Sequence, residues 1–78
     1  MSDITVDLVD LVERVTEHPG ITTALKFESL DNWTSLVALR LLTDIEDAFG
    51  VQLDLRAYLA VTDVGQLSAL VSDTLAVR

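Results

Sequence analysis

Apolar residues recur at helical spacing near the start of the chain. Four of them follow the i, i+3, i+4, i+7 pattern of one helix face: Leu8, Leu11, Val12 and Val15. This spacing predicts an amphipathic helix from about residue 3 to residue 17, with Ser2 or Asp3 as its N-cap. The run His18-Pro19-Gly20 ends the helix, because proline disfavours a helical residue before it and glycine accepts unusual backbone angles.

The stretch from Pro19 to about Thr34 shows no clear apolar period, and we interpret it as a long loop. It exceeds the usual connection of ~4–6 residues, and long ordered loops are often functional. Phe27 and Leu30, with Trp33 as a third candidate, are expected to anchor this loop to the helices. Residues 22–25 are a candidate for one helical turn.

The helical period returns over residues 35–49, and Gly50 is the expected stop. Thr34 is the predicted N-cap, with Ser35 as the alternative. Successive helix residues are about 100° apart around the axis. Five apolar side chains therefore fall on one stripe that we expect to face the core: Ala38, Leu41, Leu42, Ile45 and Phe49.

Two further helices are predicted in the last third of the chain. Asp54 can cap a short helix over residues 55–60, and Asp63-Val64-Gly65-Gln66 resembles a capping box that opens a fourth helix. The expected buried face of that helix is Val64, Leu67, Val71 and Leu75. With no hairpin signal, we expect an all-α fold: a four-helix bundle with three main helices, one short third helix and a long first loop, in a single domain over residues 1–78.

The other side of the second predicted helix carries an unusual mixture of residues: Leu36, Leu39, Arg40, Thr43 and Asp47. A face turned only to solvent rarely shows two leucines within its first two turns. Two explanations stay open. Either the long loop folds over the leucines, or they form a small apolar patch for a partner, ringed by Arg40, Asp44 and Asp47.

Ser35 stands where this helix leaves the loop. A helix N-terminus combines the positive end of the dipole with unpaired backbone N–H groups, so a phosphate ester on this hydroxyl would lie in a favourable field. Serine at a helix start is also a common N-cap. The residues alone leave both roles open.

The charge of the chain restricts its partners. The chain has thirteen carboxylates and five basic residues, so its net charge is −8. Such a charge disfavours binding to nucleic acids and anionic membranes. The first residues lack the basic segment of a secretory signal, and no apolar run approaches the ~18 residues that a membrane helix needs. We expect a cytoplasmic monomer that binds neither nucleic acid nor membrane.

The sequence offers little for catalysis or metal binding. His18 is the only histidine, and no residue is apparent that would orient it or form an oxyanion hole for a triad with Ser35. The cluster Asp44, Glu46 and Asp47 lacks the Asp-x-Asp-x-Asp-Gly loop of a calcium site, and the chain has no cysteine. We expect neither an enzyme nor a metal site.

Three motifs at a joint spacing resemble the acyl and peptidyl carrier protein family. The first is Ser35-Leu36, preceded by Leu-Asp-Asn-Trp-Thr, and the second is Phe49-Gly50-Val51 at the expected separation. The third is the run over residues 62–67, Thr-Asp-Val-Gly-Gln-Leu, which matches the start of the family's last helix. The resemblance covers roughly residues 3 to 77.

The resemblance implies a four-helix bundle and a 4′-phosphopantetheine arm, transferred from coenzyme A to Ser35 by a phosphopantetheinyl transferase. The thiol of the arm would hold acyl or aminoacyl groups as thioesters while the protein performs no chemistry itself. Loading, tailoring and condensing enzymes would be further partners. The face begun by Ser35 would meet them through Leu36, Leu39, Arg40, Thr43 and Asp47.

Two residues depart from the family pattern. Thr34 stands where acyl carriers usually have aspartate, and Arg40 stands where fatty-acid carriers usually have an acidic residue. The reversed charge at Arg40 favours polyketide or nonribosomal peptide biosynthesis over fatty-acid synthesis. Thr34 leaves an alternative open, namely an unmodified helical interaction module in which Ser35 is only a helix cap.

Overall fold

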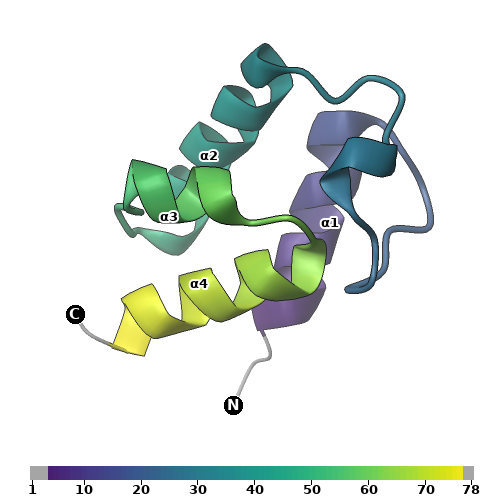
Figure 1. The fold of residues 1–78 in the computed structure, drawn as a ribbon. Helices are drawn as coiled ribbons and strands as arrows, with labels where there is room; N and C mark the ends of the chain where they lie inside the picture. Colours follow the sequence, from purple (N-terminus) through teal and green to yellow (C-terminus); the bar gives the residue numbers. More distant parts are fainter. Residues whose placement is uncertain (1–3, 77–78) are drawn as a thin grey trace.

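The computed structural model describes residues 4–76, which form an all-α fold (Figure 1). Its elements are α1 (Ile4–Thr16), the short 3-10 helix η1 (Phe27–Ser29), α2 (Ser35–Phe49), α3 (Leu55–Ala60) and α4 (Val64–Ala76). The predicted fold class is therefore confirmed. Among the described residues the only extended pairing is an isolated bridge between Lys26 and Asp63.

The helix boundaries agree with the sequence where a local signal sets them. α2 and α3 have the predicted bounds, and Gly50 ends α2 with a φ of 65° that suits glycine. α1 ends one residue earlier than predicted, because Glu17 adopts a φ of 55°. The predicted caps of α1, Ser2 and Asp3, lie outside the described residues.

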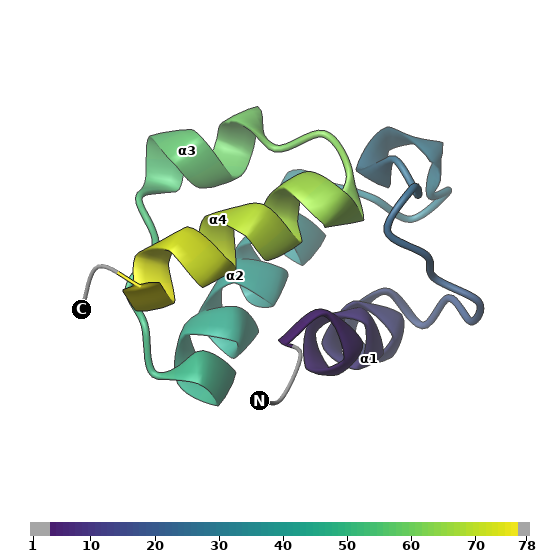
Figure 2. The same cartoon turned by 90° about the horizontal axis from the view of Figure 1, so that it is seen from below.

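The core lies where α1 and α4 pack against each other and α1 packs against α2. In the view of Figure 2, α4 lies between α1 and α3. The predicted faces of α1 and α4 are largely confirmed. The most completely buried apolar side chains are Leu8, Val12, Leu41, Ile45, Val64, Leu67 and Val71.

Three residues that we predicted to be in the core lie at its edge. Leu42, Phe49 and Leu75 are only partly buried and pack against the core from outside. For Phe49 the reason is its place at the last position of α2, where the chain turns away at Gly50. Phe49 thus faces the core as predicted but lies at its edge rather than within it.

The long loop is ordered by several contacts. Phe27 and Leu30 are buried as predicted, and the Phe27 ring stacks on Trp33 with centroids 4.7 Å apart. The Asn32 side-chain amide donates to the Thr16 carbonyl at 2.8 Å, which ties the loop to the end of α1. η1 was not predicted, whereas residues 22–25 form a single turn with a 3.1 Å backbone hydrogen bond.

α3 is a short helix held by two polar contacts. The Asp54 carboxylate caps it by accepting from the Arg56 backbone N–H at 2.8 Å. The Tyr58 hydroxyl, which is buried, donates to the Ala38 carbonyl of α2 at 2.5 Å. Burial also raises the pKa of this phenol well above its usual value. Tyr58 thus fixes the position of α3 relative to α2.

Candidate functional site

The N-terminus of α2 separates the roles of two neighbouring hydroxyl groups. Thr34 is the N-cap, with extended backbone angles, and its hydroxyl oxygen accepts from the Val37 N–H at 3.2 Å. Ser35 is the first helical residue and is exposed. Of the two N-cap candidates, the structure therefore selects Thr34, and the alternative in which Ser35 acts as the cap is wrong.

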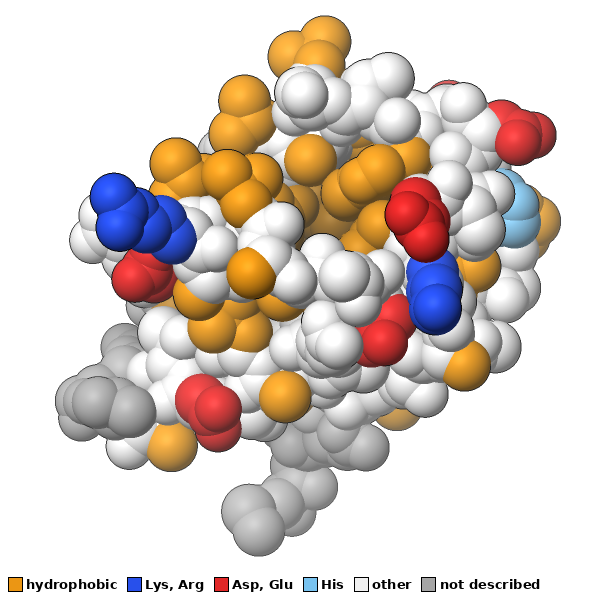
Figure 3. Space-filling model, viewed as in Figure 1, with side chains coloured by type: hydrophobic (Ala, Val, Ile, Leu, Met, Phe, Trp, Pro, Cys, Tyr) orange, Lys and Arg blue, Asp and Glu red, His pale blue; other side chains and the backbone are white. Residues whose placement is uncertain are grey.

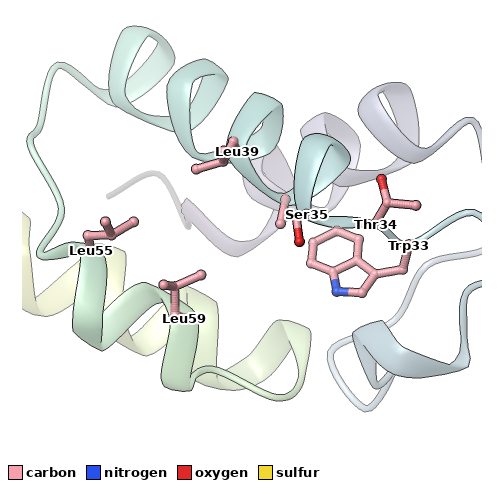
Figure 4. A pocket seen from close by; sticks show the side chains of 7 residues that line it. Trp33, Thr34, Ser35, Leu39, Leu55 and Leu59 are labelled. Carbon is pink, nitrogen blue, oxygen red and sulfur yellow. The ribbon is translucent and has the colours of Figure 1, made fainter.

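The Ser35 hydroxyl is available for chemistry. It makes no hydrogen bond to any residue between 4 and 76, and it points into the space between α2 and α3 (Figure 4). The backbone N–H groups of Ser35 and Leu36 also have no acceptor within that range, as expected for the first turn of a helix. A nucleophilic oxygen and two free donors therefore meet at the positive end of α2.

An open apolar groove begins beside Ser35. It has a volume of about 570 Å³ and is lined by Trp33, Thr34, Ser35, Ala38, Leu39, Leu55 and Leu59. Figure 4 shows Leu39 of α2 facing Leu55 and Leu59 of α3 across the groove, with the Trp33 indole next to Ser35. Apolar side chains gather around this hollow on the molecular surface (Figure 3).

All five partner-binding residues predicted on α2 are exposed: Leu36, Leu39, Arg40, Thr43 and Asp47. The structure excludes the explanation in which the long loop covers the leucines, because Leu36 is 77 % exposed and Leu39 is 49 % exposed. Only Leu39 among the five lines the groove. The Thr43 hydroxyl bonds back to the Leu39 carbonyl at 3.1 Å, so it is partly engaged within its own helix.

The sequence reasoning missed the contribution of α3. Leu55 and Leu59 are 49 % and 62 % exposed, and they form the wall of the groove opposite α2. A signal was present in the sequence, since this six-residue helix carries three large apolar side chains and Tyr58 alone is buried. Which side of α3 faces the core depends on its packing, and the sequence did not reveal it.

The described part of the chain shows no metal site and no bilayer-spanning segment. Within residues 4–76, no group of three or more histidine, aspartate or glutamate side chains is placed to hold a metal ion. None of the helices in that range is both long and apolar enough to cross a membrane.

The sequence matches the family model described as the phosphopantetheine attachment site over residues 6–71, which is most of the chain. This match includes the N-terminus of α2 and the residues on both sides of the groove. No curated protein sequence matches the chain significantly.

Two solved structures share the fold. A holo acyl carrier protein from Geobacter metallireducens superposes with a TM-score of 0.83 at 22 % identity, over 96 % of this chain and 88 % of its own. A Mycobacterium tuberculosis protein assigned as an acyl carrier protein gives a TM-score of 0.82 at 21 % identity, over 90 % of this chain and 96 % of its own. At these identities the similarity establishes the fold.

Proposed function

Because this chain belongs to the phosphopantetheine attachment site family of carrier proteins, we propose that Ser35 is the residue that bears the 4′-phosphopantetheine arm. One observation carries the proposal: Thr34 caps α2, so the neighbouring Ser35 hydroxyl is exposed and free of hydrogen bonds to the described residues. No residue of the first turn of α2 forms a hydrogen bond with this hydroxyl. We also propose that residues 1–78 act as one carrier domain.

The attachment step uses the Ser35 oxygen as nucleophile. In the active site of a phosphopantetheinyl transferase, this oxygen would attack the phosphorus of coenzyme A that carries the pantetheine. A new P–O bond forms to serine, the pyrophosphate bond breaks, adenosine 3′,5′-bisphosphate leaves, and the serine proton passes to a base of the transferase. The product is a phosphodiester at the positive end of α2, next to the free N–H groups of Ser35 and Leu36.

The residues present fit this group. The arm needs an exposed hydroxyl with room around it, and Ser35 opens directly onto the groove. When bound, the arm supplies a terminal thiol that holds cargo as a thioester. A flexible tether raises the effective concentration of cargo at each enzyme that docks on the carrier, which is how a protein without catalytic residues serves a reaction sequence.

We propose that the cargo is an acyl or aminoacyl group of polyketide or nonribosomal peptide biosynthesis, handled in the cytoplasm. Support comes from Arg40, which is exposed on α2 where an acidic residue would be usual in a fatty-acid carrier. Loading, tailoring and condensing enzymes would approach the face that begins at Ser35. Leu36, Leu39, Arg40, Thr43 and Asp47 are the residues of α2 that they would meet.

Intact mass spectrometry tests the attachment site. The chain is incubated with coenzyme A and a broad-specificity phosphopantetheinyl transferase, and wild type should gain the mass of one arm. Ser35→Ala should gain none while keeping its helical circular dichroism. Ser72→Ala, at an exposed serine of α4, is the matched control and should be modified like wild type. A mass gain in Ser35→Ala would refute the assignment, and an unmodified wild type would favour a helical interaction module that carries no arm.

A further inference from the structure

The carboxylates of this protein are concentrated on two segments that pack against each other. Residues 4–17, which are α1 and the residue after it, and residues 41–49 of α2 together contain seven of the thirteen carboxylates and one basic residue, Arg14. These two segments therefore have a net charge of −6. Residues 18–40 and 50–76 together have five carboxylates and three basic residues, a net charge of only −2. Most of the negative charge thus lies on α1 and the second half of α2.

A second, smaller groove lies between these two acidic segments. It has a volume of about 260 Å³ and is lined by Asp7, Asp10, Leu11, Arg14, Ala48 and Phe49. This α1/α2 groove shares no lining residue with the groove beside Ser35. Figure 2 shows α1 and the C-terminal end of α2 on the side of the molecule opposite α3. Ser35 and Phe49 are the first and last residues of α2, so they are about 21 Å apart along the helix axis.

The α1/α2 groove combines apolar surface, an aromatic ring and carboxylates. Leu11 and the partly buried Phe49 supply the apolar surface, and Asp7 and Asp10 are exposed. The C-terminal end of α2 adds the negative end of a helix dipole. This combination suits an arginine side chain, whose stem packs on apolar surface while the guanidinium stacks on an aromatic ring and binds carboxylates.

The only basic residue at this groove is held weakly. Arg14 pairs with Asp10 of its own helix at 3.5 Å, and both side chains are more than 60 % exposed, at 68 % and 66 %. An exposed pair of this kind contributes little to stability, so a partner can replace it. Asp7 makes no ion pair with a residue between 4 and 76. The groove therefore keeps uncompensated negative charge although it contains an arginine.

We propose that the α1/α2 groove is a second docking site, which binds an arginine-bearing segment of a basic protein and leaves the exit of the arm at Ser35 uncovered. The volume of the groove is below the ~300–1,000 Å³ of small-molecule sites, so it suits a side chain of a partner rather than a metabolite. A second copy of the chain is disfavoured as occupant because each copy has a net charge of −8. The binding itself does not depend on the modification of Ser35. Its role, to hold the carrier while the arm visits other enzymes, rests on the proposed function.

Two synthetic helical peptides test the proposal. They are identical except that each arginine of the first peptide is glutamine in the second. Each peptide is titrated into the full-length unmodified protein while its backbone amide signals and the Trp33 indole N–H are followed by nuclear magnetic resonance. The arginine peptide should shift the signals of Leu11, Ala48 and Phe49, and the glutamine peptide should bind more weakly. The indole signal should stay unchanged, because Trp33 lines the groove on the other side.

Variants of equal net charge separate the groove from the charge of the whole molecule. Asp7→Asn combined with Asp10→Asn should weaken binding of the arginine peptide about two- to thirty-fold, as the loss of two exposed ion pairs allows. The matched control is Asp31→Asn combined with Asp73→Asn, which removes two exposed carboxylates outside the acidic segments and should leave the affinity nearly unchanged. Arg14→Gln should tighten binding, because it removes the competing guanidinium from the groove.

Equal weakening in the two double variants would overturn the proposal, because the peptide would then respond to net charge alone. Shifts centred on Trp33 and Leu39 would do the same, as would concentration-dependent shifts of Phe49 without peptide, which would indicate a second copy in the groove. With the peptide at saturation, Ser35 should be modified at an unchanged rate in the mass assay, and a slower rate would refute the uncovered exit. Absence of modification without peptide would count against Ser35 as the attachment site and not against the groove.

Discussion

The substitution Tyr58→Phe tests how strongly the Tyr58 hydroxyl holds α3 against α2. In Tyr58→Phe the ring is retained, so no apolar volume is lost, but the hydroxyl that donates to the Ala38 carbonyl disappears. This bond is a polar link between α3 and α2. We therefore expect a lower stability at neutral pH and a looser groove.

The size of the effect follows from the partner atom. The Ala38 carbonyl lies within α2 and remains an acceptor in the helical ladder, so the variant leaves no orphaned buried acceptor. The cost is then that of one ordinary hydrogen bond, about 1 kcal/mol, without the further ~1–3 kcal/mol of an unsatisfied group. For a domain of this size, that is a fall of roughly 4–8 °C in Tm.

The pH dependence gives a sharper test. Because burial raises the pKa of Tyr58 in the folded state, the folded protein holds the phenol neutral while the unfolded chain ionises it near pH 10. The contribution of Tyr58 is thus complete below pH 10 and is lost as the pH rises above it. At pH 11 the loss is about 1.4 kcal/mol, which exceeds the ~1 kcal/mol of the hydrogen bond.

Urea unfolding of wild type and Tyr58→Phe from pH 7 to pH 11.5 measures both effects. Wild type should be more stable at neutral pH, and the two free energies of unfolding should cross near pH 11. The two proteins share every other ionisable side chain, so only the contribution of Tyr58 appears in the difference. A difference that stays constant across this range would show that the phenol is not held neutral by burial, and equal stability at pH 7 would show that the hydrogen bond contributes nothing.

Three further substitutions address the cap, the core edge and the docking face. Thr34→Asp should keep the N-cap of α2, stabilise the helix by ~0.3–1 kcal/mol and raise the initial rate of modification at Ser35. An equal or slower rate with the same transferase would show that threonine at this position does not slow modification. Phe49→Ala should lower the free energy of unfolding by about 2 kcal/mol, roughly half the usual loss for a core phenylalanine, because Phe49 is only partly buried. A thermal melt in which Tm falls by only about a degree or two would contradict this. Leu39→Ala should slow loading of the modified protein by its cognate enzyme about tenfold while Tm stays nearly unchanged. Val6→Ala, at an exposed residue of α1, should change neither the loading rate nor Tm. Equal loading rates of the two variants would show that Leu39 does not contact the enzyme.

Helix boundaries were predictable from the sequence where a single residue type sets them. Asp54 and Gly50 act through local geometry, a side-chain cap and a left-handed backbone, and both perform the predicted role. η1 was not predictable in this way, because no cap hydrogen bond holds its start. Its position depends on Phe27, which is buried and stacks on Trp33, and such contacts form only in the folded chain.

The candidate site shows the same division. The spacing of apolar residues predicted that Ser35 stands at a helix start. It did not predict that the Ser35 hydroxyl makes no cap hydrogen bond, since either of the two adjacent hydroxyl groups could have served as the cap. Backbone geometry at Thr34 decided between them. The groove could not be derived at all, because it requires α3 to turn Tyr58 inward and thereby to present Leu55 and Leu59 to α2.

The two sides of α2 show how a small domain can keep leucines exposed without losing its core. Ala38, Leu41 and Ile45 are buried and carry the stability of the helix, whereas Leu36 and Leu39 on the other side are exposed and carry little of it. A side chain that adds almost nothing to folding is free to be selected for binding. Substitutions on the exposed side should therefore alter docking without unfolding the domain, so function and stability can be tested separately in this chain.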